Sequence, residues 1–185
     1  MTKQHVQIGL WVFGYGSLIW RPAMEYEAAY RATAHNWARR FWQGSHDHRG
    51  TIDAPGRVLT MVPVADTNCE GRVFGIAKKN VEQTLIDLDY REKNGYERQR
   101  LTVHTDEVGE IEALSYIALE NNHAWLGHAS NQAIAEQIQL AHGPSGANRD
   151  YVLELHKALQ NDSIFDEHVH AIALSLTGET QTGRG

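Results

Sequence analysis

Short apolar runs, separated by turn residues at irregular intervals, constrain the fold of this chain most strongly. They are rich in β-branched and aromatic side chains, a composition typical of strands. The runs are Leu10–Phe13, Val58–Val64, Arg72–Ala77, Glu97–His104 and Ala113–Leu119. Within Glu97–His104, Leu101 and Val103 alternate with polar residues, which predicts one buried face. Pro63 cannot donate a backbone hydrogen bond and therefore predicts a sheet-edge position for its run.

Three other segments have helical periodicity. The first begins at Asn80, with Gln83 three residues later as a variant of the capping box, and stops at Asn94-Gly95. The second begins near Ser130 and ends at Gly143-Pro144, and the third begins near Asn148. Their apolar stripes are Val81, Leu85 and Leu88; Ile134 and Ile138; and Tyr151, Leu155 and Leu159. Strands and helices without a regular βαβ rhythm predict an α+β fold whose antiparallel or mixed sheet can close into a small barrel.

Composition excludes several classes of protein. The 185 residues fit one domain and carry a net charge of −6, which disfavours nucleic acid and anionic membranes as partners. Cys69 is the one cysteine, so an intrachain disulfide and a cysteine-rich zinc site are excluded. There is no apolar run of the roughly 18 residues that span a bilayer. We read no signal peptide and expect a cytoplasmic protein.

The segment Gly14-Tyr15-Gly16-Ser17-Leu18 directly follows the first predicted strand. Two glycines let the backbone turn sharply and let a ligand approach its N–H groups. The third glycine of a dinucleotide-binding motif is missing, and Arg21-Pro22 obstructs the helix that such a motif needs. Two interpretations remain from the local pattern: an ordinary β-turn, or a nest that binds an anion or a carbonyl. Ser17 lacks the Gly-x-Ser-x-Gly frame of a serine nucleophile.

Glu92 extends the helical stripe of Val81, Leu85 and Leu88, so a carboxylate stands where the pattern expects an apolar side chain. Burial and the negative end of the helix both predict a raised pKa for this carboxyl, toward the range of a general base. In the alternative interpretation, Arg91 or Lys93 neutralises Glu92, or the helix has already ended. Neighbours in sequence do not share a helix face, which argues against those two partners.

Basic and aromatic residues alternate in the segment from Arg39 to Gly50. Such segments bind single-stranded nucleic acid, but the net negative charge argues against that partner. His46 and His48 have no third ligand at a recognised spacing, so we predict no metal site. A small anionic substrate fits the segment better. Cys69 is predicted to lie in a turn and to be unreactive, because no cationic residue adjoins it.

Several motifs together resemble the ChaC family of γ-glutamylcyclotransferases. They lie between about Trp11 and about Leu159 and occur in the family's order. They are Val12-Phe13-Gly14-Tyr15-Gly16-Ser17-Leu18-Ile19-Trp20, Arg39 to Ser45, Asp47-His48-Arg49-Gly50, Pro55-Gly56-Arg57-Val58, Tyr90-Arg91-Glu92-Lys93-Asn94-Gly95-Tyr96, Ala135-Glu136-Gln137-Ile138, and Gly143-Pro144-Ser145-Gly146 with Asn148 and Tyr151. Asn94 stands where the family usually has glycine, and asparagine tolerates the left-handed conformation expected at a helix end.

The resemblance implies a small mixed β-barrel with flanking helices, which we assign to residues 11–176, after an N-terminal extension (1–10). Residues 177–185 are rich in glycine and threonine without an apolar pattern, so we expect a flexible tail there. It implies cleavage of glutathione to 5-oxoproline and Cys-Gly without a cofactor, with Glu92 as the general base. The implied substrate-binding residues are Val12, Phe13, Gly14, Tyr15, Gly16, Ser17, Leu18, Arg39, Arg40, Arg49 and Tyr151. One of the three arginines would bind a substrate carboxylate, and the sequence leaves open which one.

Two other functions remain as alternatives. The first is a cyclotransferase for other γ-glutamyl-amino acids or γ-glutamylamines. The second is a non-enzymatic regulator of cation transport, which would not require a carboxylate on the apolar stripe of a helix. The sequence does not indicate the oligomeric state.

Overall fold

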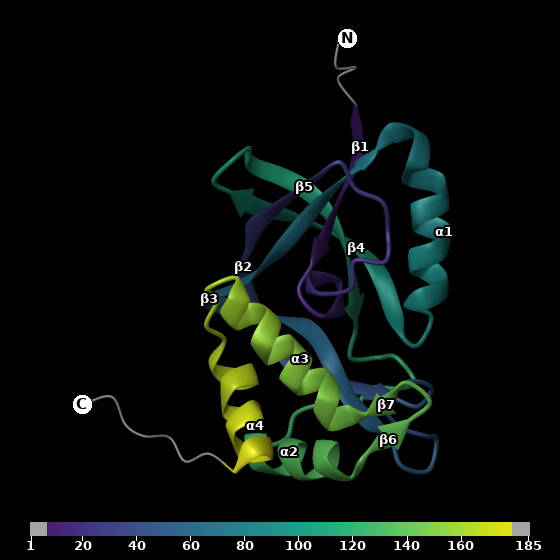
Figure 1. Ribbon diagram of the computed structural model, residues 1–185, viewed down its shortest axis with the longest axis vertical. Helices are drawn as coiled ribbons and strands as arrows, with labels where there is room; N and C mark the ends of the chain where they lie inside the picture. The colour runs from purple at the N-terminus through teal and green to yellow at the C-terminus, as the bar shows by residue number, and fades with distance from the viewer. Residues whose placement is uncertain (1–6, 179–185) are drawn as a thin grey trace, which may run out of the picture. The chain divides into compact units, whose positions relative to one another are not determined.

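The computed structural model describes residues 7–178, and Figure 1 shows its elements. Five strands close into a barrel in the order β1-β3-β2-β4-β5, and β6 and β7 form a separate two-stranded sheet. The strands are β1 (Ile8–Gly14), β2 (Ala28–Ser45), β3 (Gly56–Ala77), β4 (Tyr96–Thr105), β5 (Gly109–Ala118), β6 (His142–Gly143) and β7 (Gly146–Ala147). The helices are α1 (Val81–Arg91), α2 (Asn131–Leu140), α3 (Asn148–Asn161) and α4 (Glu167–Thr177). None of the helices within residues 7–178 is long and apolar enough to cross a membrane.

The barrel is mixed, as the sequence predicts. Strand β1 pairs antiparallel with β3, where Phe13 lies opposite Val73, and parallel with β5, where Val12 lies opposite Leu114. In β4, Leu101 and Val103 are buried while Thr102 between them is exposed. The predicted α+β class and the small mixed barrel are therefore confirmed.

Strand β3 corrects three sequence predictions. The runs Val58–Val64 and Arg72–Ala77 are two parts of this one strand. Pro63 does not mark a sheet edge, since β3 lies between β1 and β2 in a closed barrel. Cys69 lies in the strand instead of a turn, with a fully buried side chain. Polar residues between the two apolar runs imitate a turn, although they continue the strand.

Strand β2 has no apolar run that would reveal it. Its buried positions include small residues such as Ala32, Ala34 and Ala38, whereas Arg31 and His35 are exposed. Alanine is depleted in strands, so this alternation carries a weak strand signal. The sequence-based prediction consequently missed a strand of 18 residues that includes Arg39 and Arg40.

The ends of the helices depart from the predicted ends. Asn80 precedes α1 but makes no side-chain cap, so the predicted capping box is wrong. Ser130 does cap α2, because its hydroxyl accepts a hydrogen bond from the backbone of Ala133 at 3.2 Å. Helix α2 ends at Leu140, ahead of the predicted Gly143-Pro144, and a short hairpin of β6 and β7 follows. Helix α4 was not predicted.

The expected N-terminal extension and C-terminal tail are each partly inside the described residues. Ile8 already lies in β1, inside the expected extension 1–10, of which residues 1–6 lie outside the described residues. Thr177 ends α4, and Gly178 follows it in the left-handed conformation with φ 73°. The rest of the expected tail, from residue 179 on, also lies outside the described residues.

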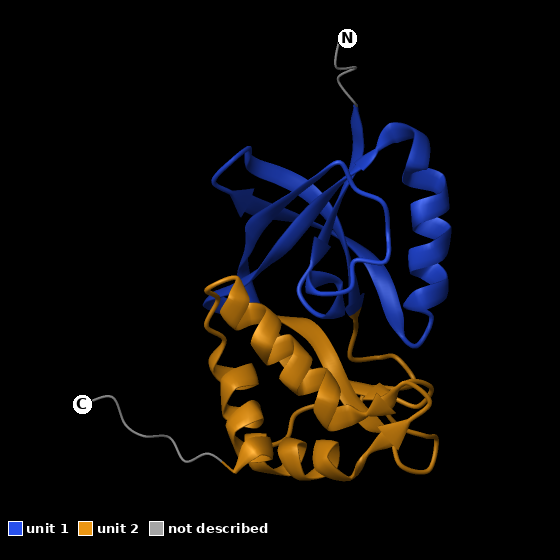
Figure 2. Cartoon of the chain, in the orientation of Figure 1, with its two compact units in different colours: residues 1–38, 63–117 blue, residues 39–62, 118–185 orange. Residues whose placement is uncertain are grey.

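The chain divides into two compact units, coloured separately in Figure 2. The first contains the described parts of Met1–Ala38 together with Pro63–Ile117, and the second contains Arg39–Val62 and the described part of Ala118–Gly185. A core in the first unit comprises Val12, Leu18, Phe74, Ile76, Leu88, Leu114 and Tyr116. In the second unit, α2, α3 and α4 pack against one another.

Candidate functional site

The turn after β1 is the first part of the candidate site. Strand β1 ends at Gly14, and a single helical turn of residues 17–19 follows, in which the N–H of Ile19 donates to the carbonyl of Gly16 at 2.9 Å. A Cβ atom at Gly14 would lie 2.7 Å from the Cβ of Leu18, closer than side chains approach each other. The tight return of the chain over Gly14 therefore requires glycine.

The structure reduces the number of side chains in the predicted binding segment that could contact a ligand. Val12 and Phe13 lie in β1 with fully buried side chains, so these side chains belong to the core. Leu18 is also buried in the core of the first unit. Tyr15 is buried as well, and its hydroxyl donates to the carbonyl of Tyr116 at 2.8 Å. The polar groups that this segment offers to a ligand thus come from its backbone and from Ser17.

Glu92 lies at the C-cap of α1, one residue beyond the last residue of the helix. Its N–H donates to the carbonyl of Leu88 at 2.9 Å, and its side chain is 18% exposed. Glu92 therefore continues the apolar stripe in sequence, but it lies just beyond the helix, where the backbone is no longer helical. Gly95, with φ 86°, takes the left-handed conformation that we expected at Asn94.

Arg91 connects Glu92 to the turn after β1. Its Nη2 donates to the hydroxyl of Ser17 at 2.6 Å, and its Nη1 donates to the carbonyl of Arg21 at 2.9 Å. Its Nε lies 3.2 Å from Oε1 of Glu92. The sequence argument against Arg91 as a partner of Glu92 is wrong, because it assumed helical geometry at a residue that lies beyond the helix.

Burial raises the pKa of the Glu92 carboxyl above its ordinary value, and the positive charge of Arg91 acts in the opposite direction. The raised pKa agrees with the sequence prediction. A carboxylate with a raised pKa has a higher affinity for a proton than an ordinary one, which is what a general base needs.

A second polar network joins α1 to strands β4 and β5. The carboxylate of Asp89 pairs with Arg98 and accepts a hydrogen bond from the hydroxyl of Tyr116 at 2.6 Å. The hydrogen bond from Arg98 lowers the pKa of Asp89, and burial raises the pKa of Tyr116. Since the carbonyl of Tyr116 holds Tyr15, this network supports the turn from the side of β5. Sequence reasoning did not identify it, because its members are far apart in the chain.

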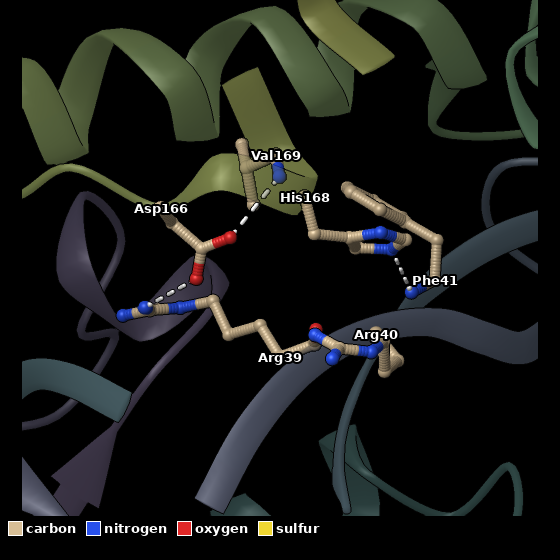
Figure 3. A network of polar contacts seen from close by, with 6 residues as sticks. All are labelled: Arg39, Arg40, Phe41, Asp166, His168 and Val169. Carbon is tan, nitrogen blue, oxygen red and sulfur yellow. Dashed lines mark hydrogen bonds and ion pairs between the residues drawn. The ribbon is translucent and has the colours of Figure 1, made fainter. Parts of the chain in front are cut away.

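The second unit contains the predicted arginines. Arg39 is 1% exposed, and its Nη1 lies 3.1 Å from Oδ2 of Asp166. The other oxygen of Asp166 accepts the N–H of Val169 at 3.1 Å, which caps α4, and Figure 3 shows the carboxylate between the two groups. The charge of Arg39 is thus already balanced by an aspartate.

Arg40 and the segment after it have different surroundings. Its Nη1 donates to the carbonyl of Arg39 at 2.6 Å, and its guanidinium lies 6.0 Å from the ring centre of Trp42. The next residue, Phe41, donates its N–H to Nε2 of His168 at 3.1 Å (Figure 3). Burial, followed by the charge of Arg40, lowers the pKa of His168 to about 4, so this imidazole is neutral at pH 7.

Arg49 and Tyr151 lie together, as two of the predicted binding residues. The guanidinium of Arg49 is 5.7 Å from the ring centre of Tyr151 and donates to the carbonyl of Ala147 at 3.1 Å. Its Nη2 is 3.9 Å from Glu154, a long ion pair. Arg49 is thus a buried cation whose charge is balanced only weakly.

Arg57 is a further buried cation, which the sequence analysis named only within a family motif. Its Nε donates to Gln137 at 2.6 Å, and its Nη1 donates to the carbonyls of Phe41 and Gly127 at 2.9 and 3.0 Å. Its backbone N–H and carbonyl are both bound by the side chain of Asn148, at 2.7 and 2.9 Å. Burial lowers the pKa of Arg57. These contacts tie α2 and the start of α3 to β3.

Residues 7–178 contain no group of three or more histidine, cysteine, aspartate or glutamate side chains that could hold a metal ion. His48, one of the two histidines considered above, lies 3.2 Å from the hydroxyl of Ser145.

The family described as ChaC-like protein matches residues 10–177. γ-Glutamylcyclotransferase 2-3 of Arabidopsis thaliana is 37% identical over 174 residues, which cover 90% of this chain and 87% of that protein. Glutathione-specific γ-glutamylcyclotransferase 1 of Homo sapiens is 36% identical over 169 residues, which cover 88% of this chain and 76% of that protein.

A solved structure agrees with these relatives. The crystal structure of a γ-glutamylcyclotransferase specific to glutathione from yeast superimposes with a TM-score of 0.87 at 28% sequence identity. The superposition covers 97% of this chain and the whole of the yeast chain. The agreement therefore extends over the entire domain.

Proposed function

This chain belongs to the ChaC-like family, and from that membership we propose that it is a glutathione-specific γ-glutamylcyclotransferase. The reaction splits glutathione into 5-oxoproline and Cys-Gly. Relatives named for this activity cover most of the chain, and the yeast enzyme of the same specificity has the same fold. The observation in the structure that carries the proposal is the largely enclosed carboxylate of Glu92, which Arg91 links to the turn after β1.

The reaction is intramolecular. The amine of the γ-glutamyl group attacks its own γ-carbonyl carbon, a five-membered lactam forms, and the amide bond to the cysteinyl nitrogen breaks. Neither water nor a cofactor is consumed. An enzyme that holds the γ-glutamyl chain in the folded, reactive conformation gains a large part of the rate from orientation alone.

Glu92 is the proposed general base. The substrate amine is an ammonium at pH 7, and it must lose a proton before its lone pair can attack. The nitrogen loses a second proton as the lactam forms, and the departing cysteinyl nitrogen takes up two protons, one as the amide bond breaks and one as it leaves as an ammonium. Glu92 carries protons from the first nitrogen to the second. Its raised pKa suits both steps, since the carboxyl must accept a proton and then release it.

The turn after β1 is the proposed site for the γ-glutamyl group. Backbone N–H groups of Tyr15, Gly16 and Ser17 would stabilise the negative charge that develops on the carbonyl oxygen. The missing side chain of Gly16 would allow the substrate to approach this backbone closely. The side chains of Val12, Phe13 and Leu18 support this turn from the core.

Arg40 is the proposed first choice among the arginines for a substrate carboxylate. Arg39 is paired with Asp166, and Arg49 has Glu154 at 3.9 Å. Within residues 7–178, Arg40 is bonded to a carbonyl and packs near an indole ring, with no ion pair to an acidic residue. A guanidinium without an anionic partner is the one best prepared to bind a carboxylate in two hydrogen bonds. Tyr151 would pack beside the substrate.

We also propose a cytoplasmic location and a small-molecule substrate as the partner, with no nucleic acid. The net charge of −6 and the single buried cysteine support these assignments.

A panel of γ-glutamyl compounds tests the proposal. Purified protein is incubated with reduced glutathione, γ-glutamyl-alanine and a γ-glutamylamine, and 5-oxoproline is quantified. Glutathione should be strongly preferred, because a shorter ligand leaves groups of the site unpaired at a cost of about 1–3 kcal/mol each. Comparable turnover of all three would favour the broader cyclotransferase. No 5-oxoproline from any of them would favour the regulator of cation transport.

A further inference from the structure

Arg91 directs the polar contacts of its side chain at the proposed base and the proposed binding turn. Its three nitrogens contact Glu92, the hydroxyl of Ser17 and the carbonyl of Arg21. The side chain is 26% exposed, so most of its surface is covered by the protein. None of the three contacts lies on the helix that carries Arg91, because Glu92 is already beyond the end of α1.

The planar guanidinium fixes how its partners lie. Nε and Nη2 form one edge of the group, and their N–H bonds point the same way. That edge holds Oε1 of Glu92 at 3.2 Å and the hydroxyl of Ser17 at 2.6 Å, so the two oxygens lie side by side. Oε2 of Glu92 is not the atom in this ion pair. Nη1 holds the far end of the turn through Arg21 at 2.9 Å.

We propose that Arg91 is a positioning residue of the cyclotransferase reaction, which holds the Glu92 carboxylate beside Ser17 and aims its second oxygen at the substrate amine. This inference rests on the proposed function, since it assumes that Glu92 is the base and that the turn holds the γ-glutamyl group. It assigns to Arg91 no contact with the substrate.

Arg91 also sets the charge of the base. Burial favours the protonated form of Glu92, and a protonated carboxyl accepts no proton. In the described residues, Arg91 is the charged group that acts on Glu92 in the opposite direction. The other ionisable groups nearby are otherwise engaged: Asp89 with Arg98 and Tyr116, and Lys93 over the ring of Tyr90 at 4.5 Å. Arg91 therefore favours the charged form of Glu92 and partly offsets the effect of burial on its pKa.

A purely structural Arg91 would anchor the turn and leave the base unaffected. Two variants separate these roles. Arg91→Gln removes the charge and the shared edge. Arg91→Lys keeps a positive charge, but its compact ammonium cannot present two parallel N–H groups from one planar edge. Arg100→Gln is the matched control, since Arg100 forms an exposed ion pair with Glu112 in the same unit.

The measurements are the pH profile of kcat, KM, the melting temperature, and titration of the Glu92 carboxyl by ¹³C NMR in glutamate-labelled protein. In Arg91→Gln, the acidic limb of kcat and the Glu92 titration should both move up by about one pH unit. In Arg91→Lys, both should stay near the wild-type position while the plateau of kcat falls about tenfold, because the carboxylate is misplaced. Arg100→Gln should match the wild type in every readout.

Several results would overturn the proposal. One is a folded Arg91→Gln protein with the wild-type Glu92 titration and kcat, even if its melting temperature is lower, since Arg91 would then be only an anchor. If Arg91→Gln does not fold, Arg91→Lys decides: a reduced plateau with an unmoved limb supports the proposal, and a wild-type plateau refutes it. Glu92→Gln is measured in parallel. If Glu92→Gln turns over glutathione normally, Glu92 is not the base and the proposed function of this residue is refuted. If Glu92→Gln is inactive while Arg91→Gln is fully active, Glu92 remains the base and only the role of Arg91 is refuted.

Discussion

Glu92 and His168 are partly buried in different units, and burial displaces their pKa values in opposite directions. In both cases the low-dielectric surroundings disfavour the charged form, so the pKa of the acid rises and that of the imidazole falls. Each displacement makes the free energy of unfolding depend on pH, and each dependence can be isolated with a neutral variant.

Glu92→Gln should stabilise the protein at pH 7. The folded pKa of Glu92 lies above its ordinary value of 4.5, so its charge opposes folding once the pH exceeds both values. As the pH rises through the folded pKa, the wild type loses stability that the glutamine variant retains. The gain in melting temperature should thus be present at pH 7 and shrink toward zero below pH 4.5. Melting curves across this range test the prediction, and a variant that is less stable at pH 7 would contradict it.

His168→Gln should reduce the acid sensitivity of the protein. The neutral imidazole accepts the N–H of Phe41, and protonation of Nε2 would abolish that bond. Its ordinary pKa of 6.5 falls to about 4 in the fold, so the unfolded chain binds the proton first as the pH decreases. Stability from this residue is complete above pH 6.5 and is lost on the way down to about pH 4.

The groups around His168 are Arg40 and His128, which lower its pKa, and Asp166, which raises it. Between pH 7 and pH 4.5, the melting temperature of His168→Gln should fall less than that of the wild type. His104→Gln, at a half-exposed histidine in β4, is the control and should follow the wild type. An equal loss of melting temperature in His168→Gln and the wild type would show that other groups dominate the acid response.

Among the elements, the junction of β3 with α3 depends on one buried side chain. Asn148 is fully buried and satisfies both backbone groups of Arg57. Asn148→Ala leaves a buried N–H and a buried carbonyl unpaired, at about 1–3 kcal/mol each, so the free energy of unfolding should fall by about 2–6 kcal/mol. Urea unfolding measures this loss, and Gln132→Ala on the exposed face of α2 is the control. A loss below about 1 kcal/mol would mean that the backbone of Arg57 finds other partners.

Elements with a strong period could be predicted from the sequence, and elements defined by distant partners could not. The stripes of α1 and α3 and the alternation of β4 were identified because burial follows the period of each element. Strand β2 was missed because alanines fill its buried face, and β3 was split because polar residues interrupt its apolar pattern. Helix α4 was missed, although Asp166 caps it through Val169, as an aspartate before a helix commonly does.

At the scale of the whole molecule, the order of motifs along the chain predicted the family before any geometry was known. The raised pKa of Glu92 was also predicted, since a carboxylate in line with an apolar stripe is rare, but the residue lies beyond α1 and pairs with Arg91, as the alternative interpretation had it. The contact of Arg91 with Glu92 and Ser17 was not predictable from spacing, because it depends on where α1 ends. The pairing of Arg39 with Asp166 joins residues 127 positions apart, a separation that no local pattern reports.

The proposed reaction uses neither a metal nor a thiol. Cys69 is buried in β3, and residues 7–178 contain no cluster of metal-ligating side chains. Turnover of glutathione should therefore be unchanged by EDTA and by Cys69→Ser. Loss of most activity with EDTA, restored by a divalent cation, would contradict the mechanism.

We propose that Glu92 transfers the proton that lets the γ-glutamyl amine close the ring. Glutamine has nearly the shape of glutamate and can still hydrogen-bond the amine, but it accepts no proton. Formation of 5-oxoproline from glutathione is measured with wild type and Glu92→Gln, alongside glutathione binding and melting temperature on the same preparations. We predict a folded variant that still binds glutathione and turns it over about 10²–10⁴-fold more slowly. A folded Glu92→Gln protein with near-wild-type turnover would contradict the account, because the base would then lie elsewhere.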